Sequence, residues 1–362
     1  MVTLPEGRSL PNLEGLRLIA SVLIVADHYL RYLHLPTGGL QLAVDLFFVI
    51  SGIVIAMIYQ GRVHDLATYS GFVRKRIARL YPLHFLTLAF YVTIGALIAA
   101  GHVAPENVEK YNAGEIIPNL LMIHAWSPSG VISYNYVSWS ISAEFFVYLC
   151  FPLILFLVVR GFGVGLLACV ALLLLAIALS HQIVGVPLTE LNWRFGALRA
   201  VPSFAFGVWL WAHRDRLARP GLLRASASPV TLIAMLCFLG LIAFLPNHYL
   251  MLACVYVVVV CAFVCDLTGR RSFASWTPIS SRGYLTYSIY MLHTVIATVV
   301  ISFIFPRLFG RSEVAVLTAV ACSAALTYAA AYISYWGFET PLRALIGGKR
   351  PPKAVAASLE TR

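Results

Sequence analysis

Ten apolar stretches, each close to the length that crosses a lipid bilayer, divide this chain of 362 residues. A helix needs about 20 apolar residues to span the hydrocarbon core, whereas a membrane β-strand needs only about 10. The composition agrees, since 60% of the residues are hydrophobic and 11% are charged, unlike those of a soluble domain. We therefore predict an all-α polytopic membrane protein with about ten transmembrane helices, at residues 16–33, 40–59, 80–100, 138–159, 163–180, 197–213, 229–245, 249–267, 284–305 and 314–337. A further apolar segment, 116–126, is too short to cross and is interpreted as a surface or re-entrant element.

Charge placement predicts the orientation of these spans. With ten spans, both termini lie on one side, and that side carries 20 of the 26 Lys and Arg residues. Cytoplasmic loops carry the excess of such residues, which predicts an N-in, C-in protein of the cell membrane. The formal charge of +11 then reflects topology and contact with anionic membrane lipids, and no nucleic-acid motif is present. The opposite side holds the remaining six cations: Arg31, Lys110, Arg194, Arg199, Arg307 and Arg311.

The domain organisation is expected to be one membrane domain, residues 16–343, with two cytoplasmic flanks. The arm 1–15 lacks the small-residue cleavage site of a signal peptide, so the first span is expected to be retained. The tail 344–362 is polar and rich in Pro and Lys, which predicts disorder. All seven cysteines fall in apolar spans without metal-ligand spacing, which is typical of small buried hydrophobic residues, and we expect no metal.

Arg17 and His28 lie eleven residues apart in the first span. Eleven helical steps bring the second side chain to within about 20° of the first, about 16 Å further along the axis. Arg17 is therefore expected near one membrane surface and His28 beyond the middle of the bilayer. Ionisable groups at that depth usually line a polar cavity or a substrate path.

Four cations, Arg74, Lys75, Arg76 and Arg79, follow one another within six residues before the third span. One interpretation is a positive-inside anchor that binds anionic lipid, with the segment lying in the interface as an amphipathic helix. The other is a site for a ligand with several phosphates, since the planar guanidinium of Arg binds phosphate oxygens in bidentate fashion.

Two carboxylates interrupt apolar spans. Asp45 lies near the outer end of the second span, where it is either interfacial or functional. Glu144 enters an apolar helix by about two turns, after three hydroxyl side chains. It is interpreted either as the partner of an arginine or as part of the cavity that holds His28.

Tyr287, Tyr290 and His293 are spaced three residues apart in the ninth span and share a broad helix face. His293 is expected near the middle of the membrane. It is either a neutral histidine bonded to a neighbouring helix or a member of the site.

These pieces, taken together and in this order, resemble acyltransferase family 3, the integral-membrane O-acyltransferases. The similarity runs over residues 10–82, 138–152 and 284–293, and the region between Arg160 and Ser275 shows only hydrophobic spans. The matching segments are Leu13-Glu14-Gly15-Leu16-Arg17 with His28, 44–52 (Val-Asp-Leu-Phe-Phe-Val-Ile-Ser-Gly), Arg74-Lys75-Arg76 with Tyr81-Pro82, Ser138-Trp139-Ser140 through Glu144, 287–293 (Tyr-Ser-Ile-Tyr-Met-Leu-His) and the end signature 338–343. Two positions depart from the pattern: Leu18 replaces a small residue, and Asp27 precedes His28 where an apolar or small residue is usual.

The resemblance implies transfer of an acyl group, most often acetyl, from cytoplasmic acyl-CoA to a hydroxyl of a cell-surface, lipid-linked or secreted carbohydrate. Acetyl-CoA would be the co-substrate, and the membrane lipids surround the reaction. By the same resemblance, Arg74, Arg76 and Arg79 would hold the CoA phosphates together with Tyr81, and Arg17 would stand at the mouth of the site.

His28 would be the general base of this reaction, because an imidazole titrates near neutral pH and burial favours its neutral form. A covalent acyl-imidazole relay is a less favoured variant. Glu144 would orient the protonated His28 or bind sugar hydroxyls. Candidates for the acceptor pocket are Asp45, Ser138, Trp139 and His293.

A different class of function also fits ten spans with buried Asp, Glu and His residues. A proton-coupled transporter or a flippase of a glycan or glycolipid uses such groups in the membrane. The cluster of arginines placed with the Arg17 and His28 pair favours the acyltransferase, since a transporter does not require it. A catalytically silent membrane sensor is disfavoured because the His and Arg positions are all filled.

Overall fold

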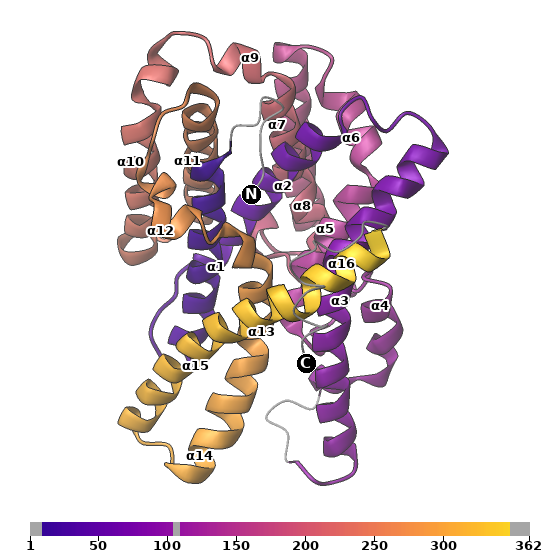
Figure 1. Ribbon diagram of the computed structural model, residues 1–362, viewed down its shortest axis with the longest axis vertical. Coiled ribbons are helices and arrows are strands. Elements are labelled where there is room, and N and C mark those ends of the chain that lie inside the picture. The colour runs from indigo at the N-terminus through magenta and orange to yellow at the C-terminus, as the bar shows by residue number, and fades with distance from the viewer. Residues whose placement is uncertain (1–8, 104–108, 348–362) are drawn as a thin grey trace, which may run out of the picture.

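The computed structural model describes residues 9–103 and 109–347, and within these ranges the chain is helical without a β-strand (Figure 1). The longer helices are α1 (Pro11–Arg31), α2 (Ala43–Tyr59), α3 (Leu66–Ala99), α5 (Trp139–Leu149), α7 (Phe162–Leu179), α8 (Gly196–Ala212), α10 (Leu222–Phe244), α11 (His248–Thr268), α13 (Thr286–Ala297) and α15 (Glu313–Ser334). The shorter helices are α4 (Ile116–Leu120), α6 (Phe151–Val158), α9 (Arg214–Leu217), α12 (Thr277–Ser280), α14 (Phe305–Leu308) and α16 (Thr340–Gly347).

Each of the ten predicted spans falls on a helix or on consecutive helices, which confirms the all-α polytopic fold. Among the described residues, seven helices are long and apolar enough to cross a membrane, or eight if the bent pair α5 and α6 is one span. The two predicted spans outside that set are α1, which carries several charged side chains, and α8, which has 17 residues. The count of ten and the N-in, C-in orientation therefore stay predictions.

Two predicted boundaries differ from the structure because of local backbone chemistry. The span predicted at 138–159 is bent by 64° between α5 and α6, where Pro152 lacks an N–H and cannot continue the helical hydrogen bonds. The loop predicted before residue 80 is helical from Leu66 onward, because the capping box of Asp65 and Thr68 starts α3 early. The cation cluster therefore lies on the first turns of one continuous helix.

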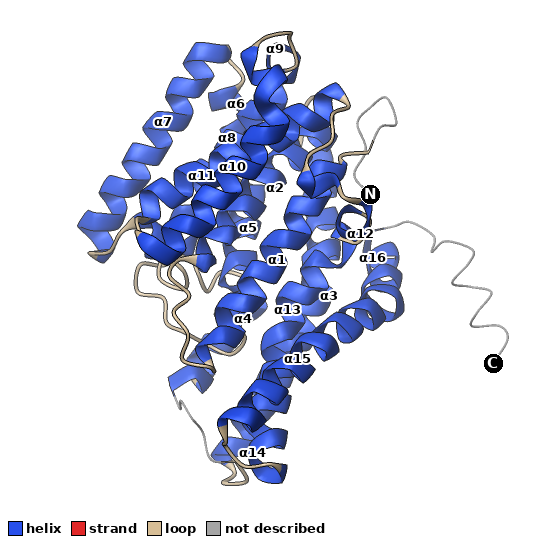
Figure 2. Cartoon of the chain, turned by 90° about the vertical axis from the view of Figure 1, so that its left-hand side faces the viewer, coloured by secondary structure: helices blue, strands red, loops and turns tan. Residues whose placement is uncertain are grey.

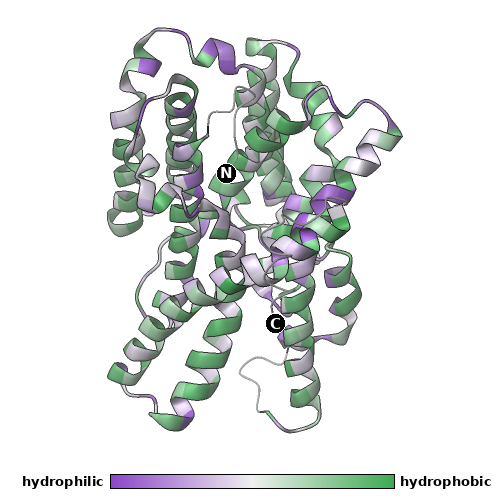
Figure 3. Ribbon diagram, in the orientation of Figure 1, coloured by the Kyte–Doolittle hydropathy of each residue, from purple (hydrophilic) through white to green (hydrophobic). Residues whose placement is uncertain are grey.

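The centre of the molecule forms where α2 and α8 cross (Figure 1). A Cβ on Gly52 would lie 2.2 Å from the Phe204 carbonyl oxygen, and one on Gly207 would lie 2.0 Å from the Val49 carbonyl oxygen. These two glycines let the backbones approach closely, as small residues do between membrane helices. Around this centre, α7 and α10 keep most of their surface outside the protein interior, and apolar residues cover their outward faces (Figure 3).

The helix α9 lies at the end of the molecule opposite α14 (Figures 1 and 2). The sequence assigns these two segments to opposite sides of the membrane, and they lie at opposite ends of the molecule.

The short segment 116–126 forms α4 and a following turn. It buries Met122, His124 and Ala125, whereas Ile117 and Leu121 are exposed. Its interpretation as a surface or re-entrant element stays a prediction.

Helices extend into both of the predicted flanks. The first helix already starts at Pro11, inside the arm assigned to 1–15. At the other end, α16 continues through Gly347, so the first residues of the predicted tail are helical. Residues 1–8 and 348–362 lie outside the described part of the chain.

Candidate functional site

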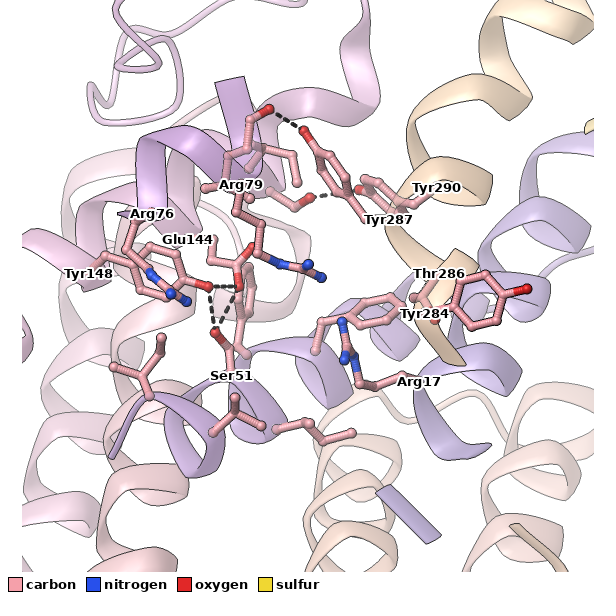
Figure 4. A pocket seen from close by; sticks show the side chains of 18 of the residues that line it. Arg17, Ser51, Arg76, Arg79, Glu144, Tyr148, Tyr284, Thr286, Tyr287 and Tyr290 are labelled. Atoms are coloured by element: carbon pink, nitrogen blue, oxygen red, sulfur yellow. Dashed lines mark hydrogen bonds between the residues drawn. The ribbon is translucent and has the colours of Figure 1, made fainter. Parts of the chain in front are cut away.

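Four arginines from three helices line one polar cavity of about 220 Å³, here called the arginine cavity (Figure 4). Arg17 comes from α1, Arg76 and Arg79 from α3, and Arg343 from α16. Arg76 and Arg79 are three residues apart and therefore share a face of α3. The positive charges of Arg79 and Arg76 are close enough to repel the guanidinium of Arg343. Two carboxylates line the same cavity, Glu14, which lies 3.6 Å from Arg17, and Glu144. Four cations therefore stand against two anions, and the excess positive charge favours an anionic ligand.

Arg76 is held rigidly at the edge of this cavity. Its side chain is buried, it donates a hydrogen bond of 3.0 Å to the Tyr59 hydroxyl, and its guanidinium lies 5.1 Å from the centre of the Tyr59 ring. The ring of Tyr148 lies 5.8 Å away on another side. The buried Nε–H of Arg76 has no hydrogen-bond partner within the described protein. A buried donor without a partner is costly and points to a ligand that supplies the acceptor.

A second cavity of about 670 Å³, the α16 cavity, adjoins the first. The two share Ile58, Arg76, Tyr335 and Arg343 as lining residues. The α16 cavity adds further cations, Arg62 and Lys75. A cationic path therefore leads from the start of α3 and from α16 into the helix bundle.

Not all of the predicted donor-site residues reach these cavities. Arg74 is exposed and lines neither of them. Tyr81 also lines neither, and its ring stacks on that of Phe85 at 6.1 Å. Of the predicted phosphate ligands, the structure brings Arg76 and Arg79 together with Arg17. It adds Arg343, which the sequence had marked only as part of an end signature.

Glu144 faces the arginines across the cavity (Figure 4). Its carboxylate accepts a hydrogen bond of 2.7 Å from the Ser51 hydroxyl and another from the hydroxyl of Tyr148. The ion pairs found among the described residues do not include Glu144, so the interpretation as a direct arginine partner fails there. Nor does Glu144 share a cavity with His28, which is absent from the residues lining the arginine cavity.

His28 instead pairs with His293. The His28 Nδ1 atom lies 2.8 Å from Nε2 of His293, and Nδ1 of His293 lies 2.7 Å from the Tyr290 carbonyl oxygen. A carbonyl only accepts, so His293 carries its proton on Nδ1 and, when neutral, presents a bare Nε2. His28 then donates from Nδ1 to that nitrogen, and its own Nε2 is left unprotonated. The network thus selects the tautomer in which His28 Nε2 can accept a proton.

A carboxylate also stands near the free nitrogen of His28. Asp27 Oδ2 lies 3.9 Å from His28 Nε2 and 2.7 Å from a guanidinium nitrogen of Arg31. The side chain of Asp27 is buried, and its Oδ1 has no hydrogen-bond partner in the described chain. Asp27 departs from the resembled pattern, and the sequence placed it too far from His28 for a sure contact. The structure brings it within ion-pair distance.

The histidine pair lies between two cavities along α13. Tyr287 and Tyr290 line the arginine cavity, His293 comes next on the helix, and Thr294 lines a different cavity of about 500 Å³. We call this one the tyrosine cavity. It is lined by Tyr32, Tyr111, Tyr136, Lys110, Thr294, Arg307 and Arg311, among other residues. Arg17 therefore lines the arginine cavity, whereas His28, on the same face of α1, lines neither cavity and contacts the tyrosine cavity only through the ring of Tyr136.

The remaining predicted acceptor residues have structural partners. Asp45 is buried and accepts hydrogen bonds of 2.6 and 3.1 Å from Arg199, so it is not interfacial. The guanidinium of Arg199 lies 5.4 Å from the ring centre of Trp139. The Ser138 hydroxyl lies 3.1 Å from Nε2 of His124. None of Asp45, Ser138 and Trp139 lines the arginine cavity or the tyrosine cavity.

Comparisons with known proteins show which family the chain is similar to. The model of a family described as "Acyltransferase domain" matches residues 10–336. The protein "Acyltransferase MdmB" of Streptomyces mycarofaciens is 34% identical over 164 residues, which cover 41% of this chain and 40% of that protein. "Protein 2 in picA locus" of Rhizobium radiobacter is 41% identical over 78 residues, which cover 21% of this chain and 41% of that protein. The chain thus spans about two fifths of the length of these relatives. No solved structure matches it significantly.

Proposed function

Because this chain belongs to the acyltransferase domain family, we propose that it is a membrane O-acyltransferase. In this proposal it moves an acyl group, acetyl in the simplest case, from acyl-CoA to a hydroxyl of a cell-surface, lipid-linked or secreted carbohydrate. The observation that carries the proposal is a cationic path of two cavities that leads toward a histidine pair whose tautomer leaves one nitrogen free.

The chemistry of the donor fits the two connected cavities. Coenzyme A carries three phosphate groups at its nucleotide end and a neutral pantetheine arm that ends in the thioester. The larger α16 cavity, with Arg62, Lys75, Arg76 and Arg343, suits the nucleotide and its phosphates. The arginine cavity suits the arm, since its wall combines the cations with apolar side chains such as Val44. An arm directed toward Tyr290 approaches the histidine pair, because the rings of Tyr290 and His293 have centres 6.0 Å apart.

The reaction in this proposal is a direct transfer. Nε2 of His28 takes the proton of the acceptor hydroxyl while the oxygen attacks the thioester carbonyl carbon. The new C–O bond forms, the C–S bond breaks, and the proton passes from the imidazolium to the leaving thiolate. While His28 is charged, Asp27, 3.9 Å from Nε2, supplies the countercharge. The carboxylate of Glu144 offsets part of the positive charge of the arginines and, in this proposal, does not orient His28.

A thermal-shift titration of the detergent-purified chain tests the donor half of this proposal. A ligand that binds only the folded state raises the apparent stability with concentration. We expect saturable stabilisation by acetyl-CoA and free CoA, with succinyl-CoA included to compare acyl groups. The double variant Arg79→Ala and Arg343→Ala should lose it, whereas Arg219→Ala, an exposed arginine on the same predicted side, should keep it.

Two further variants sharpen the outcome. Arg74→Ala should bind like wild type, because the structure leaves Arg74 outside both cavities; a loss equal to that of the double variant would restore the sequence-based assignment. His28→Ala should bind acetyl-CoA but transfer nothing, and transfer near the wild-type rate would refute the mechanism. A folded protein that none of the CoA compounds stabilises would favour a transporter instead.

A further inference from the structure

The tyrosine cavity shares no lining residue with the arginine cavity and lies on the other side of the histidine pair along α13. Its walls come from the ends of α1, α3, α13 and α14 and from Lys110 and Tyr111. In Figure 1, α14 and the end of α3 that is remote from the cation cluster both lie at the bottom of the molecule, opposite α9. This cavity therefore opens toward the end of the molecule that the charge pattern assigns to the outer side of the membrane.

The cavity is in contact with the surroundings of His28. The ring of Tyr136, one of its walls, meets the imidazole of His28 edge-on with centres 5.2 Å apart. Thr294 directly follows His293 and is fixed by a 2.8 Å hydrogen bond from its hydroxyl to Asn135. The side chain of His28 remains 18% exposed. A compound seated in this cavity thus has a short path to the free nitrogen of His28.

The described part of the cavity wall is positively charged. Among the described residues, the lining includes three cations, Lys110, Arg307 and Arg311, and no carboxylate. The ammonium of Lys110 lies over aromatic rings, so the charge that meets a ligand is mainly that of the exposed Arg307 and Arg311. The three cations are half of the six Lys and Arg residues that the sequence assigns to the outer side, where such residues are scarce. A cleft lined by one sign of charge concentrates ligands of the opposite sign. The cavity is therefore suited to an anion.

The rest of the wall is aromatic and hydroxylated. It contains Tyr32, Tyr111 and Tyr136, and the Lys110 ammonium lies 5.1 Å from the ring centre of Tyr136 and 5.8 Å from that of Tyr111. Thr294, Thr298 and Ser302 add hydroxyl oxygens that can accept hydrogen bonds from a sugar. The volume of about 500 Å³ lies within the range of small-molecule sites.

We infer that the tyrosine cavity is the acceptor site and that the acceptor is an anionic sugar, one that carries a phosphate or a carboxylate beside the hydroxyl that is acylated. The inference rests on the proposed function, and it adds the chemical class of the acceptor and its point of entry. A soluble sugar phosphate and a sugar attached to a lipid through phosphate share this chemistry.

The test measures binding to the detergent-purified full chain with defined probes: glucose 1-phosphate, glucuronic acid, glucose, inorganic phosphate and a polyprenyl-phosphate glucose. We expect the anionic sugars to bind at least about tenfold more tightly than glucose, because charge-assisted hydrogen bonds are the stronger ones. Their binding should weaken as salt is raised. A preference for the polyprenyl-linked sugar over glucose 1-phosphate identifies a lipid-linked acceptor, and the reverse identifies a soluble one.

Matched variants locate the site. The double variant Arg307→Ala and Arg311→Ala should weaken binding of the anionic sugars at least tenfold and leave stabilisation by acetyl-CoA unchanged. Arg194→Ala, an exposed arginine of the same predicted side that does not line the cavity, should change neither. Equal binding of glucose and the anionic sugars, binding only of inorganic phosphate, or undiminished binding by the double variant would overturn the inference. So would binding of acetyl-CoA with no binding of any sugar. If an anionic sugar binds through Arg307 and Arg311 while acetyl-CoA does not, the site stands and the proposed donor function falls.

Discussion

Replacing His293 tests whether its hydrogen bond prepares His28 for catalysis. In the wild type, Nε2 of His293 accepts from Nδ1 of His28 over 2.8 Å, and the Tyr290 carbonyl fixes the proton of His293 at 2.7 Å. His293→Phe keeps a planar ring in the fully buried position but removes the acceptor. The proton of His28 then has no reason to stay on Nδ1, and the tautomer with the free Nε2 is no longer selected.

The size of the effect follows from this one bond. Leaving a buried donor without its acceptor costs about 1–3 kcal/mol, and about 1.4 kcal/mol corresponds to a factor of ten in rate. We therefore expect His293→Phe to lower kcat about 10- to 100-fold. His293 is a positioning residue, so some transfer should survive, in contrast to His28→Ala. Stabilisation by acetyl-CoA should not change, because neither histidine lines the arginine cavity.

The assay is transfer of labelled acetyl from acetyl-CoA to the anionic sugar that binds best, followed across pH. His293→Gln is the matched control, because its side-chain oxygen can stand where Nε2 of histidine stood and accept from His28. We expect Gln to recover at least part of the activity that Phe loses. Wild-type kcat in His293→Phe would refute the reasoning, and so would equal losses in the Phe and Gln variants at every pH.

Three further predictions concern the surrounding structure. Arg199→Ala leaves the buried carboxylate of Asp45 without its ion-pair partner and should lower the free energy of unfolding in detergent by about 3–5 kcal/mol. The double variant Arg199→Leu and Asp45→Leu should recover most of this loss. An unchanged unfolding midpoint in Arg199→Ala would contradict this prediction. Gly207→Ala places a Cβ 2.0 Å from a backbone oxygen and should lower the free energy of unfolding by about 1–3 kcal/mol. The Cβ of Gly240→Ala meets nothing within 4 Å, so this control variant should not lose stability. Equal losses of stability in the two variants would disprove the close contact between the helices. Asp27→Asn removes the carboxylate 3.9 Å from His28 Nε2 and should slow acyl transfer about tenfold without changing the affinity for acetyl-CoA. A wild-type rate of transfer in this variant would show that the imidazolium needs no countercharge.

The sequence was sufficient for the helical class and for the approximate positions of the helices, because apolar length is a local property; the number of helices that span the membrane stays a prediction. Helical periodicity in the sequence also explains why Arg74 lies outside the site. On a helix, Arg74 and Arg76 point about 160° apart, whereas Arg76 and Arg79 lie within about 60° of each other. Treating the segment from Leu66 as helix would have separated them, and the capping box of Asp65 and Thr68 was the signal for that start.

Other features depend on contacts between distant segments and could not be predicted from one sequence. The partner of Asp45 is Arg199, 154 residues away, and the partner of His28 is His293, 265 residues away. Helical periodicity gives the face on which a side chain lies but not the helix that packs against it. For the same reason, placing Arg17 and His28 on one face of α1 could not show that Arg17 lines the arginine cavity while His28 lies outside it.

The location of the histidine pair between two cavities has an energetic consequence for the proposed reaction. The donor enters from one face and the acceptor from the other, so coenzyme A never crosses the membrane and the acyl group crosses only as the bond is exchanged. The proton lost by the acceptor at the outer face ends on the CoA thiol at the inner face. The acyl group that moves outward replaces that proton, so the acceptor and coenzyme A each keep their charge and the exchange moves no net charge through the electric field of the membrane. Moving a unit charge through the whole field would be worth about 2.3 kcal/mol per 100 mV, so an electroneutral exchange lets the transfer proceed independently of the membrane potential.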